Sequence, residues 1–320
     1  MRVVMMGTGT FAEPTLEALL IRPGQVAGLV TQPDRAIGAQ RGSTRQVGRG
    51  MKEIAQAAGV PVFQPDSINT AEGVAKLRGW RPDLLVVAAY GQILSKDVLG
   101  AARLGGINVH ASLLPKYRGA APVAWAIYHG EKKTGVTIIR MTTGLDAGEM
   151  LAQEAIDIFP EETAGELEAR LAPQGAKLTL EVLDRMQAGT VAGIPQDKSQ
   201  ATKAPKLKKR DGLIDWSKPA EQVCRQIRAM QPWPTAYTFF RRFGRPAQRV
   251  IINLATATQA ADSRSATPGQ LAGSGHLVVY AGQGAVEVRE LQPAGKNRMS
   301  GEEFLRGHIL KAGDHFGPET

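Results

Sequence analysis

Over residues 1–192, short apolar runs alternate with longer stretches in which apolar side chains recur at helical spacing. The runs are typical of strands buried in a parallel sheet, and the stretches are typical of helices with one apolar face. The predicted strands are Arg2–Met6, Val26–Thr31, Val60–Phe63, Asp83–Tyr90, Gly106–His110 and Gly135–Met141. The predicted helices are Phe11–Ile21, Met51–Ala58, Ala71–Arg78, Ala120–His129 and Thr163–Met186. This alternation predicts an α/β domain built on an open, doubly wound sheet.

The pattern changes in the segment 193–211, which contains two prolines and a cluster of basic residues. Proline interrupts helix, and a dense run of like charge is typical of a linker. Beyond it we predict one helix at Ala220–Met230, followed by short strands separated by turns that contain Gly or Pro. These strands are Arg249–Leu254, His276–Tyr280 and Ala285–Leu291. The predicted parts are an α/β domain at 1–192, a basic linker at 193–211 and a small antiparallel β-barrel at 212–320.

Composition excludes several classes of protein. The chain has 320 residues, of which 43% are apolar, and its longest apolar run, Leu84–Tyr90, is far shorter than a membrane span. Its N-terminus leads directly into a predicted strand, so we expect no membrane association and a cytoplasmic location. A single cysteine, Cys224, cannot form an internal disulfide, and the chain lacks the Cys/His spacing of a zinc module. We therefore expect no bound metal.

The net charge of +9 is distributed unevenly. Residues 1–200 carry 21 Lys and Arg against 20 Asp and Glu, whereas residues 201–320 carry 18 against 10. Lys and Arg supply most of the sequence-independent affinity of proteins for nucleic acids, because they neutralise phosphates. This excess predicts that the C-terminal part contacts a polyanion, with a basic solubilising surface as the alternative. The densest cluster comprises Lys203, Lys206, Lys208, Lys209 and Arg210.

A glycine-rich turn follows the first predicted strand. The segment 7–12, which reads GTGTFA, has the GxGxxA spacing of a dinucleotide-binding turn, and Asp34 follows the second predicted strand. Any doubly wound fold also favours glycine at this turn, for tight geometry alone. A nicotinamide-dependent dehydrogenase is therefore a minor alternative.

Three polar residues near the ends of two later strands suit acyl transfer. Asn108 and His110 lie two apart at the end of one predicted strand, so their side chains project from the same face. Open α/β sheets bind ligands at this carboxyl edge. Asn donates to a polarised carbonyl and His moves protons near neutral pH, while Asp146, after the next strand, is able to orient the imidazole. From spacing alone, a capped strand end and a turn aspartate explain these residues equally well.

The same residues lie in segments that resemble the folate-dependent formyltransferase superfamily. These segments are 108–122 (NVHASLLPKYRGAAP), 134–137 (TGVT) and 144–148 (GLDAG). Further segments resemble the members whose acceptor is methionyl initiator tRNA, namely 31–35 (TQPDR), 214–216 (IDW), 231–234 (QPWP) and 291–299 (LQPAGKNRM). The resemblance implies a Rossmann-like formyltransferase domain followed by an OB-like barrel. It also implies 10-formyltetrahydrofolate as formyl donor and methionyl initiator tRNA as acceptor, with no obligate protein partner.

The resemblance also implies roles for individual residues. Asn108 and His110 are expected to hold the oxyanion, while Asp146 fixes His110 and helps move a proton. The folate pocket is expected to be lined by Ser112, Leu113, Leu114 and Pro115, with apolar side chains and exposed main chain. Contacts to tRNA phosphates are expected from Lys206, Lys208, Lys209 and Arg210.

The sequence departs from the family in the loop that follows Asp34. Ala39 stands where the family carries an arginine that contacts the tRNA. The segment stays basic through Arg41, Arg45, Arg49 and Lys52. We expect Arg41 to take over that contact. Two other functions stay open: formyl transfer to another amine, such as an amino sugar nucleotide or glycinamide ribonucleotide, and RNA binding without catalysis. The basic linker and barrel argue against the first, and the intact Asn, His and Asp argue against the second.

Overall fold

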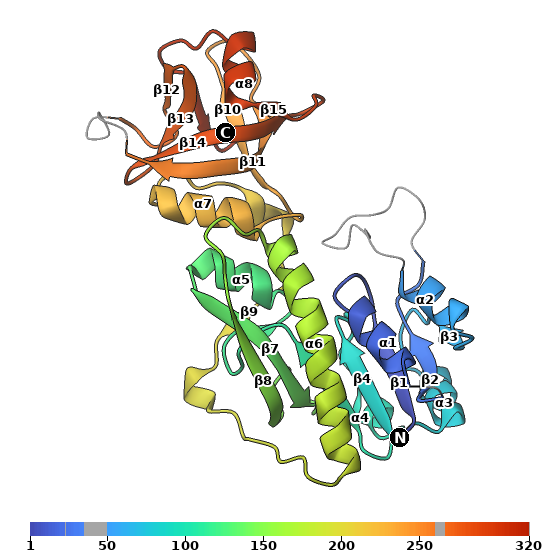
Figure 1. Cartoon of the computed structure of the whole chain (residues 1–320). Coiled ribbons are helices and arrows are strands. Elements are labelled where there is room, and N and C mark those ends of the chain that lie inside the picture. The colour runs from blue at the N-terminus through green and yellow to red at the C-terminus, as the bar shows by residue number, and fades with distance from the viewer. Residues whose placement is uncertain (23, 35–49, 260–265, 320) are drawn as a thin grey trace. The chain divides into compact units, whose positions relative to one another are not determined.

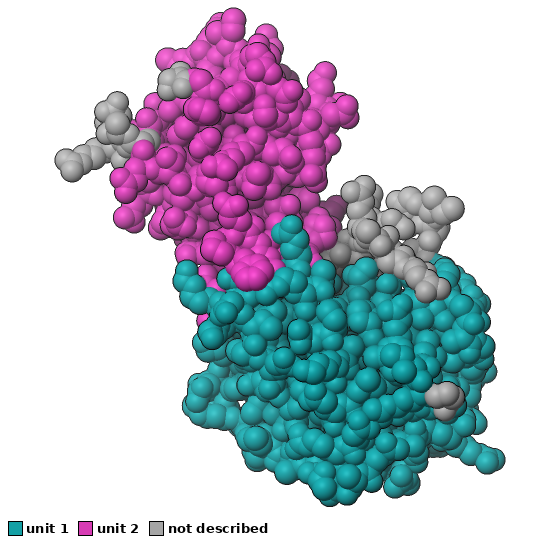
Figure 2. Space-filling model, viewed as in Figure 1, with its two compact units in different colours: residues 1–123, 132–158, 166–206 teal, residues 124–131, 159–165, 207–320 magenta. Residues whose placement is uncertain are grey.

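The structure is a computed structural model that describes residues 1–22, 24–34, 50–259 and 266–319. It forms two compact units, which Figure 2 shows in different colours. Unit 1 comprises Met1–Val123, Lys132–Ile158 and Glu166–Lys206. Unit 2 comprises Ala124–Glu131, Phe159–Gly165 and Leu207–Thr320. The chain passes from unit 1 to the barrel within the segment that the sequence marks as a basic linker.

Unit 1 is built on a twisted sheet with the strand order β3-β2-β1-β4-β5-β7-β8. These strands are β1 (Val3–Gly7), β2 (Val26–Val30), β3 (Val62–Phe63), β4 (Leu84–Ala88), β5 (Gly106–His110), β7 (Lys133–Arg140) and β8 (Met150–Asp157). The first five pair in parallel, while β5 with β7 and β7 with β8 pair antiparallel. Two short strands, β6 (Arg118–Gly119) and β9 (Lys203–Ala204), pair in parallel beside it. The predicted Rossmann-like fold is confirmed, and its sheet is mixed.

The helices of the α/β fold are α1 (Glu13–Leu20), α2 (Met51–Ala57), α3 (Ala71–Trp80), α4 (Lys96–Leu99), α5 (Pro122–His129) and α6 (Ala164–Gln187). Every residue of β1 and β4 is buried, which explains why these strands read as continuous apolar runs. In Figure 1, α6 runs along one face of the sheet. A Cβ atom at Gly175 of α6 would lie only 2.7 Å from Cγ1 of Val109 in β5, so glycine permits close helix–strand packing. Val109 lies between Asn108 and His110, and this contact therefore supports the strand that carries them.

The strands of unit 2 form a nearly closed antiparallel barrel with the order β12-β13-β14-β11-β10-β16. They are β10 (Ala236–Arg241), β11 (Gln248–Thr258), β12 (Leu271–Ser274), β13 (His276–Tyr280), β14 (Ala285–Pro293) and β16 (His315–Gly317), with β15 (Met299–Ser300) paired to β14. A bridge between Gln270 and His315 joins the two edges. Unit 2 also contains the helices α7 (Ala220–Ala229) and α8 (Gly301–Gly307) and the 3₁₀ turn η2 (Lys209–Gly212), whereas the 3₁₀ turn η1 (Lys198–Gln200) lies in unit 1. The predicted OB-like barrel is confirmed.

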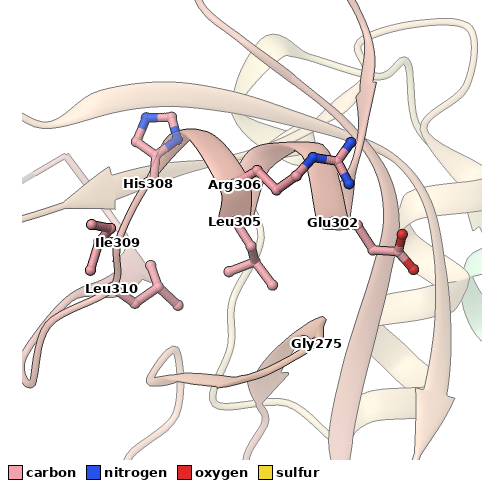
Figure 3. Close-up of a pocket in the computed structure, with 7 residues that line it drawn as sticks. All are labelled: Gly275, Glu302, Leu305, Arg306, His308, Ile309 and Leu310. Atoms are coloured by element: carbon pink, nitrogen blue, oxygen red, sulfur yellow. The ribbon is translucent and has the colours of Figure 1, made fainter.

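A cavity of about 440 Å³ lies beside α8 in unit 2 (Figure 3). Its lining comprises Gly275, Glu302, Leu305, Arg306, His308, Ile309 and Leu310. None of the residues that the sequence singles out contributes to this lining. The residues that the sequence singles out for chemistry lie instead at the carboxyl end of β5 and in the turn after β7. Within the described ranges, no helix is long and apolar enough to cross a membrane.

Candidate active site at the end of β5

The structure brings Asn108, His110 and Asp146 together at the carboxyl end of β5. The two β5 side chains lie on one face, and Asp146 reaches them from the turn between β7 and β8. Nδ2 of Asn108 donates to Oδ1 of Asp146 at 3.4 Å, and Nδ1 of His110 lies 3.6 Å from Oδ2 of Asp146. The side chains of His110 and Asp146 are only 6% and 12% exposed. Low exposure strengthens the electrostatic coupling of these groups, because little water screens them.

The orientation of His110 is set by a main-chain carbonyl. Nε2 of His110 lies 2.9 Å from the carbonyl oxygen of Tyr117. A carbonyl only accepts, so Nε2 must carry the hydrogen of this bond. Nδ1 is then the nitrogen that faces Asp146 and the nitrogen available for proton transfer. Tyr117 adopts a left-handed φ of 63°, and its N–H donates to Oγ1 of Thr202 at 2.8 Å.

The turn that carries Asp146 is tightly constrained. Asp146 itself has a φ of 47°, a conformation that Asp and Asn tolerate better than most residues. The N–H of Gly119 donates to Oδ2 of Asp146 at 2.9 Å. At Gly148, an added Cβ would lie 1.7 Å from the carbonyl oxygen of Arg140, so only glycine fits there. This geometry explains the glycine that follows Asp146 by two positions.

The segment 112–115 contributes packing and main-chain structure near the site. Ser112 is fully buried and its Oγ donates to the carbonyl of Lys116 at 2.7 Å, while Leu114 is 3% exposed. Leu113 and Pro115 are half-buried. The expectation of exposed main chain is wrong at Leu114. Its N–H and carbonyl are both occupied, by Oγ1 of Thr137 at 3.2 Å and by Nε2 of Gln153 at 3.0 Å.

Four polar residues to which the sequence analysis assigned no role support the site. Thr137 of β7 and Gln153 of β8 bond to each other at 2.8 Å and to the main chain of 112–114. Arg118 and Gln196 bond to each other, and Gln196 bonds to the main chain of the Asp146 turn. Thr137 was detectable as a polar residue inside an apolar strand. Gln196 carried no such signal, because it lies in the segment expected to be a linker.

The basic residues divide between the units. Lys206 closes unit 1, whereas Lys208, Lys209 and Arg210 lie in unit 2 at and before η2, and all four are exposed. Exposed cations at a 3₁₀ turn are accessible to phosphates. The predicted tRNA contacts Arg41 and Arg45, together with Ala39, lie outside the described residues.

The glycine-rich turn lacks the free carboxylate that a dinucleotide site requires. Asp34 forms an ion pair with Lys52, and Oδ1 of Asp34 accepts a hydrogen bond from Nε2 of Gln64 at 2.9 Å. The Lys52 contact and then the Gln64 bond hold the pKa of Asp34 below its usual value. The acidic group that would bind a ribose is therefore already engaged. Among the described residues, no group of His, Cys, Asp and Glu has the arrangement of a metal site.

Solved structures of formyltransferases share this fold. The N-formyltransferase from Helicobacter canadensis, solved with folinic acid and dTDP-3-aminofucose, is 16% identical with a TM-score of 0.67, over 90% of this chain and 98% of that one. Glycinamide ribonucleotide transformylase 1 from Symbiobacterium toebii is 24% identical with a TM-score of 0.50, over 61% of this chain and 94% of that one. At such identities the likeness concerns the fold.

Sequence comparison is more specific. Family models described as "Formyl transferase" and "Formyl transferase, C-terminal domain" match residues 1–183 and 206–309. The methionyl-tRNA formyltransferase of Solibacter usitatus is 44% identical, covering 99% of both chains. That of Bacillus subtilis is 40% identical, covering 99% of this chain and 98% of its own. The chain belongs to the methionyl-tRNA formyltransferase family.

Proposed function

We propose that the chain transfers the formyl group of 10-formyltetrahydrofolate to the α-amino group of methionyl initiator tRNA, for translation initiation. The observation that carries this proposal is the convergence of Asn108, His110 and Asp146 at one sheet edge, in a chain 44% identical over its length to a methionyl-tRNA formyltransferase. Because charged initiator tRNA is made and used in the cytoplasm, the proposal assigns the reaction to that compartment.

The reaction begins when the neutral α-amine attacks the formyl carbon. A new C–N bond forms, and the π electrons of the formyl carbonyl move to its oxygen. The attacking nitrogen then loses a proton and N10 of the folate gains one. The electron pair on the oxygen re-forms the carbonyl as the bond between the formyl carbon and N10 breaks, and N10 leaves with the electrons of that bond. The products are formylmethionyl-tRNA and tetrahydrofolate. Every step moves protons and electron pairs between groups of the substrates and side chains, so no metal is required.

Each of the three residues has a role in these steps. Nδ2 of Asn108 and Nδ1 of His110 both lie at the Asp146 carboxylate, so an oxygen near that point would receive two donors. The Tyr117 carbonyl keeps the imidazole from rotating away. Asp146 stabilises the protonated imidazole and, through water, accepts the proton that the amine loses. The structure thus supports Nδ1 as the working nitrogen of His110.

The donor and acceptor are assigned to different parts of the chain. The folate is assigned to the segment Ser112, Leu113, Leu114 and Pro115, where the half-buried Leu113 and Pro115 supply apolar contact and the other two hold the backbone. The tRNA is assigned to the barrel domain at 212–320 and the linker at 193–211. Catalysis is assigned to the domain at 1–192. Phosphate contacts come from Lys206, Lys208, Lys209 and Arg210. Arg41 and Arg45 are proposed to contact the acceptor end of the tRNA.

The proposal is tested by measuring transfer of labelled formyl from 10-formyltetrahydrofolate to several amines. The acceptors are methionyl initiator tRNA, methionyl elongator tRNA, an amino sugar nucleotide and glycinamide ribonucleotide. We expect rapid transfer to the initiator tRNA alone. Faster transfer to the sugar nucleotide or to the ribonucleotide would show that this chain uses the acceptor class of its distant structural relatives, and would reject the proposed acceptor. No transfer to any of the four would reject the catalytic assignment.

A further inference from the structure

The turn that carries Asp146 is held by a side-chain pair from elsewhere in the chain. Nε2 of Gln196 donates to the carbonyl of Asp146 at 2.8 Å and to the carbonyl of Gly148 at 2.7 Å. Oε1 of Gln196 accepts from Nε and Nη2 of Arg118, at 3.0 and 2.7 Å. The carbonyls only accept and the guanidinium only donates, so the orientation of the amide is fixed by its partners. Both hydrogens and both acceptor sites of Gln196 are used.

The arrangement separates the arginine charge from the catalytic carboxylate. Among the described residues, the side chain of Arg118 bonds to Gln196 and not to the turn itself, and Gln196 bonds to main-chain carbonyls of the turn. Within the described part of the chain, the Asp146 carboxylate contacts Gly119, Asn108 and His110. A direct Arg–Asp pair would compete with His110 for that carboxylate. The amide between them keeps the carboxylate available while fixing its backbone.

The segment 194–204 also reaches the other side of the site. Ile194 and Met150 exchange two main-chain hydrogen bonds of 2.9 Å, which place Gln196 beside the Asp146 turn. Farther along, Oγ1 of Thr202 accepts from the N–H of Tyr117, the residue whose carbonyl holds His110. One segment thus contacts the supports of both Asp146 and His110.

We propose that Gln196, held by Arg118, is a positioning residue that sets the placement of Asp146 against His110 during formyl transfer. Asp146 adopts a left-handed φ of 47°, and the two bonds from Gln196 hold the carbonyl of Asp146 itself and that of Gly148, so they fix the peptide that directly follows this conformation and the peptide two residues farther along. Without them the carboxylate loses its fixed distance to Nδ1 of His110. This inference rests on the proposed function, because the effect is read in the formyl-transfer rate.

The first test compares Gln196→Ala with Gln200→Ala, using initiator tRNA and 10-formyltetrahydrofolate. Gln200 is exposed on the same segment, and within the described ranges its side chain bonds to Asp197 alone, so it is the matched control. We expect kcat of Gln196→Ala to fall about 10- to 100-fold, because misplacing a catalytic group by a fraction of an ångström is costly. KM for either substrate should stay within about twofold, as should both constants of the control.

A second variant separates positioning from mere stabilisation. In Gln196→Glu the side chain still accepts from Arg118, but it has no hydrogen to donate to the carbonyls of 146 and 148. We expect the melting temperature of the wild type to be largely retained while kcat falls as in Gln196→Ala and the pH–rate profile changes shape. Wild-type kcat in the glutamate variant would overturn the inference.

A double-mutant cycle tests whether Arg118 acts through Gln196. In the double variant Arg118→Ala/Gln196→Ala, the fold-loss of kcat should be no more than about twice the fold-loss in Gln196→Ala alone. If the fold-losses of kcat in Arg118→Ala and Gln196→Ala multiply in the double variant, Arg118 acts independently of Gln196 and the inference is overturned. An inactive wild type would reject the proposed function, whereas an active wild type with fully active Gln196 variants would reject the positioning role alone.

Discussion

Replacing Asp146 by asparagine changes the charge at the candidate site with almost no change in shape. Asparagine also tolerates the left-handed φ of 47° at this position, so the backbone of the turn is kept. The carboxylate faces three donors: the N–H of Gly119, Nδ2 of Asn108 and Nδ1 of His110. In either orientation of the asparagine amide, its NH₂ group faces at least one of these donors. The variant therefore loses both the negative charge and one favourable contact.

The size of the effect follows from the geometry. At the 3.6 Å between Nδ1 of His110 and Oδ2 of Asp146, unit charges attract by about 4–5 kcal/mol at an effective dielectric of about 20. Desolvation of the carboxylate offsets part of this attraction, and the asparagine dipole retains another part. We expect a net loss of about 2–4 kcal/mol in the transition state, which corresponds to a kcat lower by roughly 30- to 1000-fold.

The assay is single-turnover formyl transfer to methionyl initiator tRNA, with donor and tRNA affinity measured separately. Binding of both substrates should be nearly unchanged, and the pH–rate profile should change shape because His110 has lost its anionic partner. Circular dichroism and the melting temperature check that the fold is kept. Full activity with an unchanged pH profile would remove Asp146 from the mechanism. Weak folate binding with a normal single-turnover rate would place Asp146 in the donor pocket instead.

Three further predictions concern the turn, the basic cluster and the cysteine. Gly148→Ala should lower kcat because its Cβ would collide with the carbonyl of Arg140 at 1.7 Å, whereas Gly144→Ala, whose nearest neighbour lies at 3.4 Å, should be active; equal activities would contradict this. A second prediction concerns neutralisation of the exposed basic cluster formed by Lys206, Lys208, Lys209 and Arg210. The slope of the logarithm of the tRNA association constant against the logarithm of salt concentration should become shallower by up to about 3–4. An unchanged slope would exclude phosphate contact by these residues. Burial raises the pKa of the Cys224 thiol to about 12, above the unfolded value of about 8.5, so alkylation at pH 8 should be slow until urea is added. Because the pKa is raised in the folded state, the contribution of the buried thiol to the free energy of unfolding is present below about pH 8.5 and is lost as the pH rises towards 12. Urea titrations of the wild type and of Cys224→Ser at several pH values would detect this loss.

The fold was predictable where burial leaves a mark on the sequence. Strands β1 and β4 are buried on both faces, so they read as apolar runs, and the helices between them show one apolar face. Strand β8 was missed because it is an edge strand in which buried and half-exposed positions alternate with exposed ones. Strand β16 has three residues and exists through pairing with β10, far away in the sequence. Pairing of that kind depends on tertiary contact, which local patterns do not contain.

The candidate site was predictable only for the residues that one strand or one turn presents together. Asn108 and His110 share a face because a strand alternates with period two, and the glycines around Asp146 marked a tight turn. The supports of the site come from more distant parts of the chain. The carbonyl of Tyr117 holds the His110 ring, and the segment 194–204 binds both the N–H of Tyr117, through Thr202, and the Asp146 backbone, through Gln196. The segment 194–204 has one proline and many polar and charged residues, as a solvated linker does, so its composition did not indicate a supporting role. Local sequence therefore indicates which groups are candidates for the chemistry. Their relative placement depends on long-range hydrogen bonds that Gln196 donates and Thr202 accepts, and only the folded chain assembles these bonds.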